Sequence, residues 1–76
     1  MQLKPLPFRE VSRRLVAAGF IEISSKGSHV KFAKITEDGT FVAIVPNHSE
    51  IAVGTIRSII RQANISVDDF IALARR

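Results

Sequence analysis

The chain has 76 residues, which is the length of one domain, and we expect a single domain over residues 1–76. With 46% apolar and 24% charged residues, no cysteine and no apolar run near the roughly 20 residues that span a bilayer, it excludes a disulfide scaffold, a Cys-ligated metal site and a transmembrane protein. The net charge of +4 favours a polyanionic partner, foremost nucleic acid, with an anionic membrane surface or an acidic protein as alternatives.

The first predicted helix covers residues 7–19. Its apolar stripe consists of Phe8, Val11, Leu15 and Ala18, which recur at helical spacing. Pro7 suits the first helical turn, and Gly19 supplies a left-handed C-terminal cap. Glu10 and Arg14 are four residues apart, so we expect them to pair on the helix surface.

Three strands are predicted next, at residues 19–24, 28–35 and 40–45. We expect turns at Ser25-Lys26-Gly27 and Glu37-Asp38-Gly39. In the middle strand, Val30 and Phe32 face one side together with Ser28. The other side carries His29, Lys31 and Ala33. The last strand is apolar on both faces, so helices are expected on one face and, as a hypothesis, a partner on the other.

The chain ends in two predicted helices. The longer one is expected to have Thr55 as its N-cap and to end at Asn64 in the left-handed conformation. Its core face consists of Ile56, Ile59, Ile60 and Ala63, and its outer face carries Arg57 and Arg61. The short last helix begins at Ser66, and its apolar side consists of Phe70, Leu73 and Ala74.

These elements predict an α+β fold of two layers in the order α-β-β-β-α-α. Three strands joined by short turns form an antiparallel sheet, and the helices cover one of its faces. This is the layout of the double-stranded-RNA-binding fold, although a fold by itself does not establish a function.

The segment KGSHVKF, which begins at Lys26, combines residue types that serve phosphodiester chemistry. Histidine is the side chain that most often serves as general acid or base near neutral pH, which makes His29 a candidate for proton transfer. Gly27 and Ser28 can shape a phosphate site, while Lys26 and Lys31 stabilise negative charge. The set fits cleavage of RNA by the neighbouring 2′-hydroxyl. The alternative interpretation is an ordinary turn beside a solvated surface histidine.

The remaining polar residues give weaker signals. His48 is a second candidate for proton transfer or RNA binding, against the alternative that it only fills a loop. Two histidines without a carboxylate pair match no metal-ligand pattern, so no metal and no cofactor is predicted. Arg57 and Arg61 are predicted RNA contacts, provided that their helix face continues the surface of the His29 strand. The same condition applies to Arg9, Arg13, Lys31 and Lys34.

Four blocks of the sequence, Leu15–Phe20, Lys26–Phe32, Val45–His48 and Gly54–Ala63, occur together and in this order. With these blocks the chain resembles the HicA family of toxins from type II toxin–antitoxin systems. The resemblance implies a double-stranded-RNA-binding-like fold and an mRNA interferase, an endoribonuclease that cleaves mRNA independently of the ribosome. It assigns the catalytic role to His29, the histidine of the Gly-Ser-His motif.

The resemblance also implies a partner and a location. A HicB-type antitoxin is expected to bind the toxin and cover the site, in a prokaryotic cytoplasm. We expect the free toxin to be monomeric and to form a hetero-oligomer with the antitoxin, and no membrane is involved. Glu37 and Asp38 depart from what a nucleic-acid surface would choose.

Two other functions stay open at the level of sequence. A non-catalytic double-stranded-RNA-binding module usually has a lysine cluster at the start of its last long helix, where this chain has only Arg57. A protein-interaction module without a nucleic-acid role would keep every activity when His29 is replaced. If the chain is a nuclease, the second proton-transfer group is His48, a lysine or water.

Overall fold

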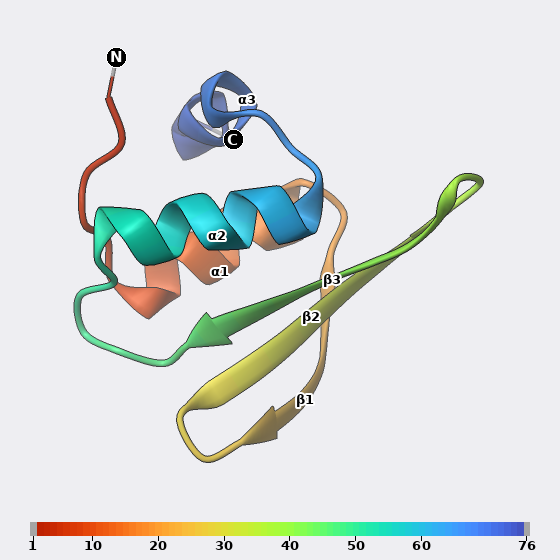
Figure 1. Ribbon diagram of the computed structural model, residues 1–76, viewed down its shortest axis with the longest axis horizontal. Helices are drawn as coiled ribbons and strands as arrows, with labels where there is room; N and C mark the ends of the chain where they lie inside the picture. Colours follow the sequence, from red (N-terminus) through yellow and green to blue (C-terminus); the bar gives the residue numbers. More distant parts are fainter. Residues whose placement is uncertain (1, 76) are drawn as a thin grey trace.

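A three-stranded antiparallel sheet carries the helices of the protein on one face (Figure 1). The computed structural model describes residues 2–75. The elements are α1 (Phe8–Ala17), β1 (Ile21–Lys26), β2 (His29–Thr36), β3 (Gly39–Pro46), α2 (Val53–Ala63), α3 (Val67–Ala72) and the short helix η1 (Leu73–Arg75). Both strand pairs are antiparallel, in the order β1-β2-β3. The predicted fold class and element order are therefore confirmed.

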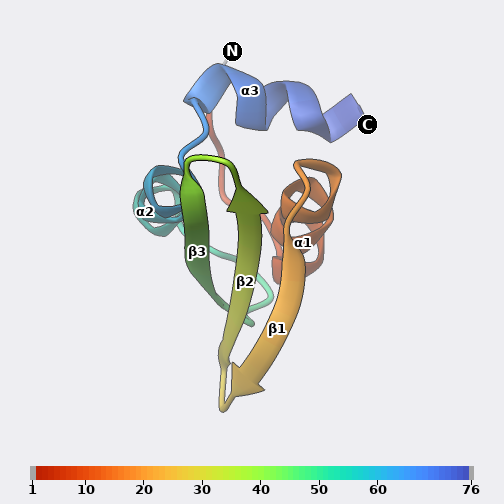
Figure 2. The ribbon, with the colours of Figure 1, turned by 90° about the vertical axis from the view of Figure 1, so that its right-hand side faces the viewer.

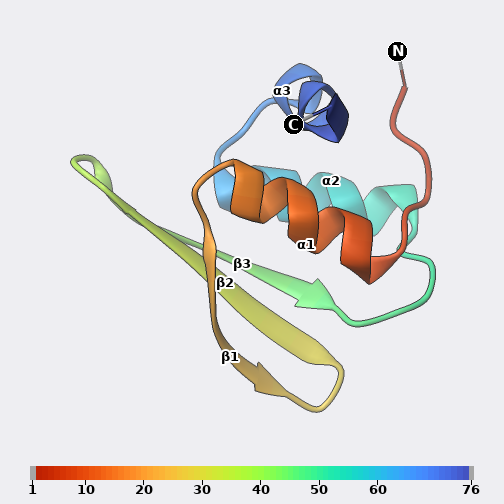
Figure 3. The ribbon, with the colours of Figure 1, turned by 180° about the vertical axis from the view of Figure 1, so that it is seen from behind.

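The layers are visible from the side. In Figure 2, α2 lies beside β3 and α1 lies toward β1, and α3 crosses above them. The β2–β3 turn projects away from the helices, whereas the β1–β2 turn lies at the opposite end of the sheet (Figure 3). The two ends of the sheet therefore have different surroundings.

The core lies between the sheet and the helices. Its largest fully buried side chains are Phe20, Phe32, Phe70, Leu15, Ile51, Ile56, Ile59, Val11 and Val45. Val30 and Phe32 are both buried, as the alternation of β2 predicts. By the area rule each large apolar side chain of this kind contributes about 1.5–3 kcal/mol. The side of β2 that bears His29 and Lys31 is thereby fixed as the outer one.

Gly19 ends α1 in the way that its sequence position predicts. Its φ is +100°, and its backbone N–H donates to the carbonyl of Val16 at 3.0 Å. The N–H of Phe20 donates to the carbonyl of Leu15, also at 3.0 Å. This pair of hydrogen bonds is a Schellman motif, which satisfies the last carbonyls of the helix and turns the chain into β1.

Two other predicted helix ends are also confirmed. Asn64 ends α2 in the left-handed region, with φ 58° and ψ 41°. The side chain of Ser66 caps α3, because its Oγ accepts a hydrogen bond from the N–H of Asp69 at 3.0 Å.

Several local predictions are wrong. β1 continues through Ser25 and Lys26, so the turn consists of Gly27 and Ser28 alone. The reason is that a two-residue loop lets both hairpin strands keep pairing up to its ends. α2 begins at Val53 after an Ala52 N-cap, which places Thr55 inside the first turn.

One prediction about burial also fails. Ala74 is exposed, because η1 takes over from α3 at Leu73 and changes the helical spacing. Ala33 is buried although it faces the outer side of the sheet. It pairs with Ile21 and Val42, whose larger side chains flank it on either side.

Candidate functional site

The Gly27-Ser28 turn places His29 at the first position of β2. Gly27 has a φ of +60°, which glycine adopts without the steric cost that a Cβ brings. A Cβ built at this position meets no atom within 4 Å, so the turn is open to solvent. Lys26 precedes the turn and His29 follows it, and the two residues are direct partners in the β1–β2 pairing. The hairpin therefore holds these two residues opposite each other.

Lys26, His29 and Lys31 share the outer face of the sheet. His29 and Lys31 alternate with the buried Val30 and Phe32, so their side chains point away from the helices. Lys26 is on the same face because directly paired residues lie on one side of a sheet, with Cβ atoms about 4.5–5.5 Å apart. All three residues are exposed. The histidine thus has one lysine across the hairpin and another two residues along its own strand.

The segment after β3 joins the same end of the sheet. Pro46 pairs with His29, and the backbone N–H of Asn47 donates to the carbonyl oxygen of Ser28 at 2.5 Å. Figure 3 shows the β1–β2 turn and the β3–α2 loop at this end. The structure therefore brings together the Gly-Ser-His and Pro-Asn-His segments, which are separate signals in the sequence.

His48 has a structural role through its backbone. Its carbonyl accepts a hydrogen bond from the N–H of Phe8 at 3.0 Å, and its own N–H donates to Pro46 at 2.9 Å. Its residue surface is exposed. The backbone of His48 therefore links the loop to the start of α1, while the residue as a whole stays exposed.

Arg57 and Arg61 lie on a different part of the surface. Gln62 marks the side of α2 that faces the sheet edge, because its Oε1 accepts a hydrogen bond from the N–H of Ile44 in β3 at 3.0 Å. Successive helical residues are rotated by about 100°, so Arg61 is about 100° and Arg57 about 140° from Gln62. Both arginines are exposed. No hydrogen bond or ion pair within residues 2–75 joins them to the His29 hairpin.

Two of the other basic residues form interactions within the fold. Lys34 faces the helical side, and its Nζ donates to the carbonyl of Ala18 at 2.7 Å. Arg13 forms an ion pair with Glu10, with 2.6 Å between Nη2 and Oε2. Hydrogen bonding from Arg13, and then from Arg14, lowers the pKa of Glu10 to about 2 although partial burial opposes this shift. The same carboxylate raises the pKa of Arg13.

The burial of Arg14 was not predicted from the sequence. Only 8% of this residue is exposed, and its guanidinium carbon lies 4.8 Å from the centre of the Phe70 ring. Its Nε donates to Glu10 at 2.7 Å, so the predicted pair with Glu10 is present. The spacing of four residues between Glu10 and Arg14 predicted the ion pair. Nothing in the sequence predicted the contact of Arg14 with α3.

Apolar side chains also lie on the outer face of the sheet. Ile21 is 64% exposed and Val42 37%, and both pair with Ala33, which faces outward. Ile23 is 50% exposed. Ile23 occupies an irregularity in the β1–β2 pairing, where β1 has one extra residue between Glu22 and Ser24. The helices leave this face uncovered.

Within residues 2–75, no three His, Asp or Glu side chains gather as a metal site would require. None of the helices in this part of the chain has the length and apolar character needed to cross a membrane.

The protein is a small basic α+β domain in which a helix, three antiparallel strands and two helices follow one another, with the helices packed against the sheet. Its surface carries an exposed histidine between two lysines. A family model described as the HicA toxin of bacterial toxin–antitoxin systems matches residues 8–65, most of the chain and all of the predicted site residues. The chain therefore belongs to the HicA toxin family, whose members are generally ribonucleases, and it is the toxin of a toxin–antitoxin system. No match was found among curated proteins.

Proposed function

We propose that this toxin is an mRNA interferase, an endoribonuclease that cleaves mRNA independently of the ribosome in the cytoplasm. The observation that carries the proposal is the exposed set of His29, Lys26 and Lys31 at the β1–β2 turn. A titratable base between two cations on an open surface suits a polyanionic substrate that is too large for a closed pocket. Membership of the HicA family supports the same activity.

In the proposed reaction, the 2′-hydroxyl of RNA is the nucleophile. His29 accepts the proton of this hydroxyl, and the oxygen attacks the adjacent phosphorus. The bond from phosphorus to the 5′-oxygen of the next nucleotide breaks, and that oxygen takes up a proton as it leaves. The products are a 2′,3′-cyclic phosphate and a 5′-hydroxyl end. No oxidant, metal or other co-reactant is consumed.

The lysines are proposed to stabilise the charge that develops on the phosphoryl oxygens. Lys26 and Lys31 flank His29 on the same face, so both ammonium groups can reach a phosphate that lies over the histidine. Gly27 and Ser28 shape the edge of this phosphate site. The proton for the leaving group comes from Lys26, His48 or water. Lys26 has the most direct relation to the histidine, because it is its cross-strand partner.

Arg57 and Arg61 are proposed as additional contacts for RNA that continues beyond the hairpin along α2. They are exposed and separate from the His29 hairpin, so they would bind phosphates several nucleotides away from the scissile bond. Such contacts increase affinity without taking part in the reaction.

The antitoxin is proposed to be of the HicB type and to cover the same outer face. The exposed Ile21, Ile23 and Val42 provide apolar surface next to the basic group, and an interface there would hide His29 from RNA. The free toxin is proposed to be a monomer that forms a hetero-oligomer with its antitoxin.

The chemical nature of the new RNA ends tests the proposed ribonuclease activity. Purified toxin is incubated with a long single-stranded RNA in EDTA, and the new ends are mapped by their sensitivity to kinase and phosphatase. We expect 5′-hydroxyl ends that accept phosphate directly, and 2′,3′-cyclic phosphates. A substrate with a 2′-deoxynucleotide at the mapped site should resist cleavage there. Products with 5′-phosphate ends would contradict attack by the 2′-hydroxyl.

A further inference from the structure

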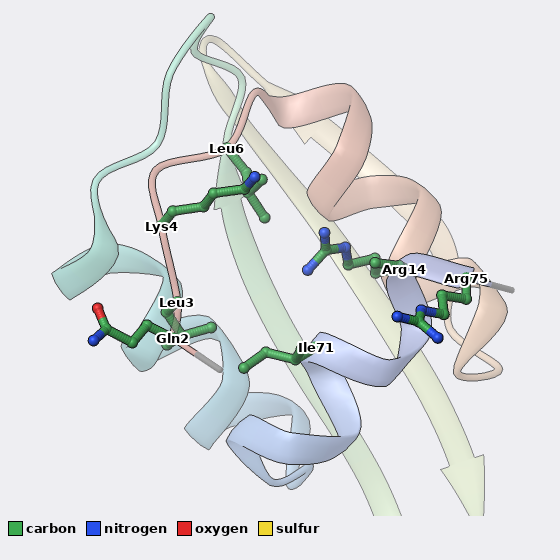
Figure 4. A pocket seen from close by; sticks show the side chains of 8 residues that line it. Gln2, Leu3, Lys4, Leu6, Arg14, Ile71 and Arg75 are labelled. Atoms are coloured by element: carbon green, nitrogen blue, oxygen red, sulfur yellow. The ribbon is translucent and has the colours of Figure 1, made fainter.

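A second candidate site lies on the other side of the molecule from the sheet, between the N-terminal segment and the last helical turns. It is a cavity of about 310 Å³, which is at the lower end of the roughly 300–1,000 Å³ of small-molecule sites. Figure 4 shows that its lining comes from three parts of the chain: the segment before α1, α1 itself, and the α3–η1 region. None of the proposed RNA-contacting residues lines it.

Among residues 2–75, the charged residues that line this cavity are all basic. They are Lys4, Arg14 and Arg75, and no acidic residue of this part of the chain lines the cavity. In Figure 4 the side chains of Lys4 and Arg14 point toward each other across the cavity. Like charges that converge in this way repel, so an anion between them would relieve the repulsion and gain charge-assisted hydrogen bonds.

Donor groups are available for such an anion. Arg14 uses Nε toward Glu10 at 2.7 Å and Nη1 toward the carbonyl of Phe70 at 3.5 Å, and its Nη2 has no hydrogen-bond partner among residues 2–75. Lys4 likewise forms no hydrogen bond or ion pair within this part of the chain. The cavity thus offers one nearly immobile donor on Arg14 and one mobile donor on Lys4.

Arg14 is well suited to be the fixed part of an anion site. It is 92% buried by residue surface, since 8% is exposed, and both Glu10 and the Phe70 ring hold its guanidinium in place. Because the side chain is already ordered, little conformational entropy is lost when a ligand binds. Glu10 balances part of its charge, but the same carboxylate is shared with Arg13.

The rest of the lining is apolar. Leu3, Leu6 and Ile71 contribute aliphatic surface beside the cations. A bare inorganic ion would leave this surface exposed to water, whereas an anion with a short aliphatic group would cover it. We propose that the cavity binds a small amphiphilic anion, whose carboxylate or phosphate head contacts Lys4 and Arg14 and whose aliphatic part packs on Leu3, Leu6 and Ile71.

The test uses the full-length ¹⁵N-labelled toxin and follows amide and Arg Nε resonances during titration. The probes are hexanoate and hexyl phosphate, which have the same chain and different heads, with acetate and 1-hexanol as controls for each half. We expect saturable shifts at Ile71, Leu6 and the Arg14 Nε for at least one amphiphilic probe. Acetate and hexanol should bind at least about tenfold more weakly. The tighter of the two amphiphilic probes identifies the head group.

Variants decide whether the cavity is responsible. Lys4→Gln removes one positive charge without breaking a hydrogen bond or ion pair of residues 2–75. It should weaken binding about tenfold, because a neutral amide hydrogen bond replaces a charge-assisted one. Arg9→Gln removes an exposed cation of α1 that does not line the cavity, and it should leave binding unchanged. Shifts that never saturate, that centre on Lys26 and Lys31, or that persist unchanged in Lys4→Gln would overturn the proposal. Neither variant changes a residue of the proposed phosphate site at Lys26, His29 and Lys31, so this result is independent of the ribonuclease activity.

Discussion

The backbone N–H of Asn47 lies 2.5 Å from the carbonyl oxygen of Ser28, and this hydrogen bond fastens the β3–α2 loop to the β1–β2 turn. It extends the β2–β3 pairing by one step beyond His29 and Pro46. The backbone on both sides of His29 is therefore held, while the imidazole stays exposed. A catalytic group is more effective when its backbone is fixed in this way, because the reacting geometry is then set before the substrate binds.

The two pairs of basic residues should differ in their roles toward RNA. When Lys26 and Lys31 are both replaced by alanine, the slope of log K against log salt should fall by about one for each phosphate that the protein no longer neutralises. The same substitution should also lower the cleavage rate, because both lysines adjoin His29.

The double variant Arg57→Ala/Arg61→Ala is the matched comparison. We expect weaker RNA binding and a flatter salt dependence, with the cleavage rate at saturating RNA unchanged. Filter binding at several salt concentrations measures both slopes. If the slope of this variant equals that of the wild type, α2 is not part of the RNA surface.

Phe32 should be among the residues on which stability depends most. Its side chain is fully buried in the middle strand and lies 6.3 Å from the Phe8 ring, measured between ring centres. Phe32→Ala should lower the free energy of unfolding by about 3–5 kcal/mol, because it removes a large apolar group and leaves a cavity. Val42→Ala, on the exposed outer face, should cost less than about 1 kcal/mol. Urea denaturation of both variants checks the difference, and a Phe32→Ala effect as small as that of Val42→Ala would place the phenylalanine outside the core.

Alanine substitution at two glycines should change stability in opposite directions. Gly19 has a φ of +100°, and a Cβ there would lie 3.1 Å from the Cε of Lys34, so Gly19→Ala should destabilise by about 1–2 kcal/mol. Gly54 is in the first turn of α2, where a Cβ meets nothing within 4 Å. Gly54→Ala should stabilise by about 0.4–1 kcal/mol through the lower entropy of the unfolded chain. Thermal unfolding measures both, and equal effects would contradict the conformation assigned to Gly19.

The Glu10 ion pairs predict a dependence of stability on acid. The pKa of Glu10 is about 2 in the folded protein and ordinarily 4.5, so its carboxylate stabilises the fold fully above pH 4.5. This contribution is lost as the pH falls from about 4.5 toward 2. Because 26% of the side chain is exposed to solvent, we expect about 1 kcal/mol.

Comparison with Glu10→Gln isolates this contribution from those of the other carboxylates. The wild type should be about 1 kcal/mol more stable than the variant at neutral pH, and the difference should shrink toward zero near pH 2. Denaturation at a series of pH values measures it. A difference that stays constant across this range would show that ionisation of Glu10 is not the cause.

The sequence was sufficient to predict the layers of the fold, because each element carries its own signal. The alternation of Val30 and Phe32 set the inner face of β2, and the left-handed positions of Gly19 and Asn64 set two helix ends. The wrong predictions concern positions where the residue types fit more than one local structure. A turn at Ser25-Lys26-Gly27 and one at Gly27-Ser28 use the same glycine, and only the pairing of Lys26 with His29 distinguishes them.

The candidate site was predicted in its parts and not in its arrangement. The KGSHVKF segment suggested Lys26, His29 and Lys31, and the alternation of β2 placed the last two on one face. The hydrogen bond between Asn47 and Ser28 depends on strand pairing between distant parts of the chain, which no local pattern encodes. The burial of Arg14 against Phe70 has the same origin, since it arises only when α3 packs on α1.

Cleavage of a long single-stranded RNA by wild-type toxin and by His29→Ala, both in EDTA, tests whether His29 takes part in the reaction. Circular dichroism first establishes that both proteins are folded, which we expect because His29 is exposed and contributes nothing to the core. We expect cleavage by the wild type and none by the folded variant. Equal cleavage by both would contradict the role of His29, and RNA binding without cleavage by either would favour a non-catalytic RNA-binding module.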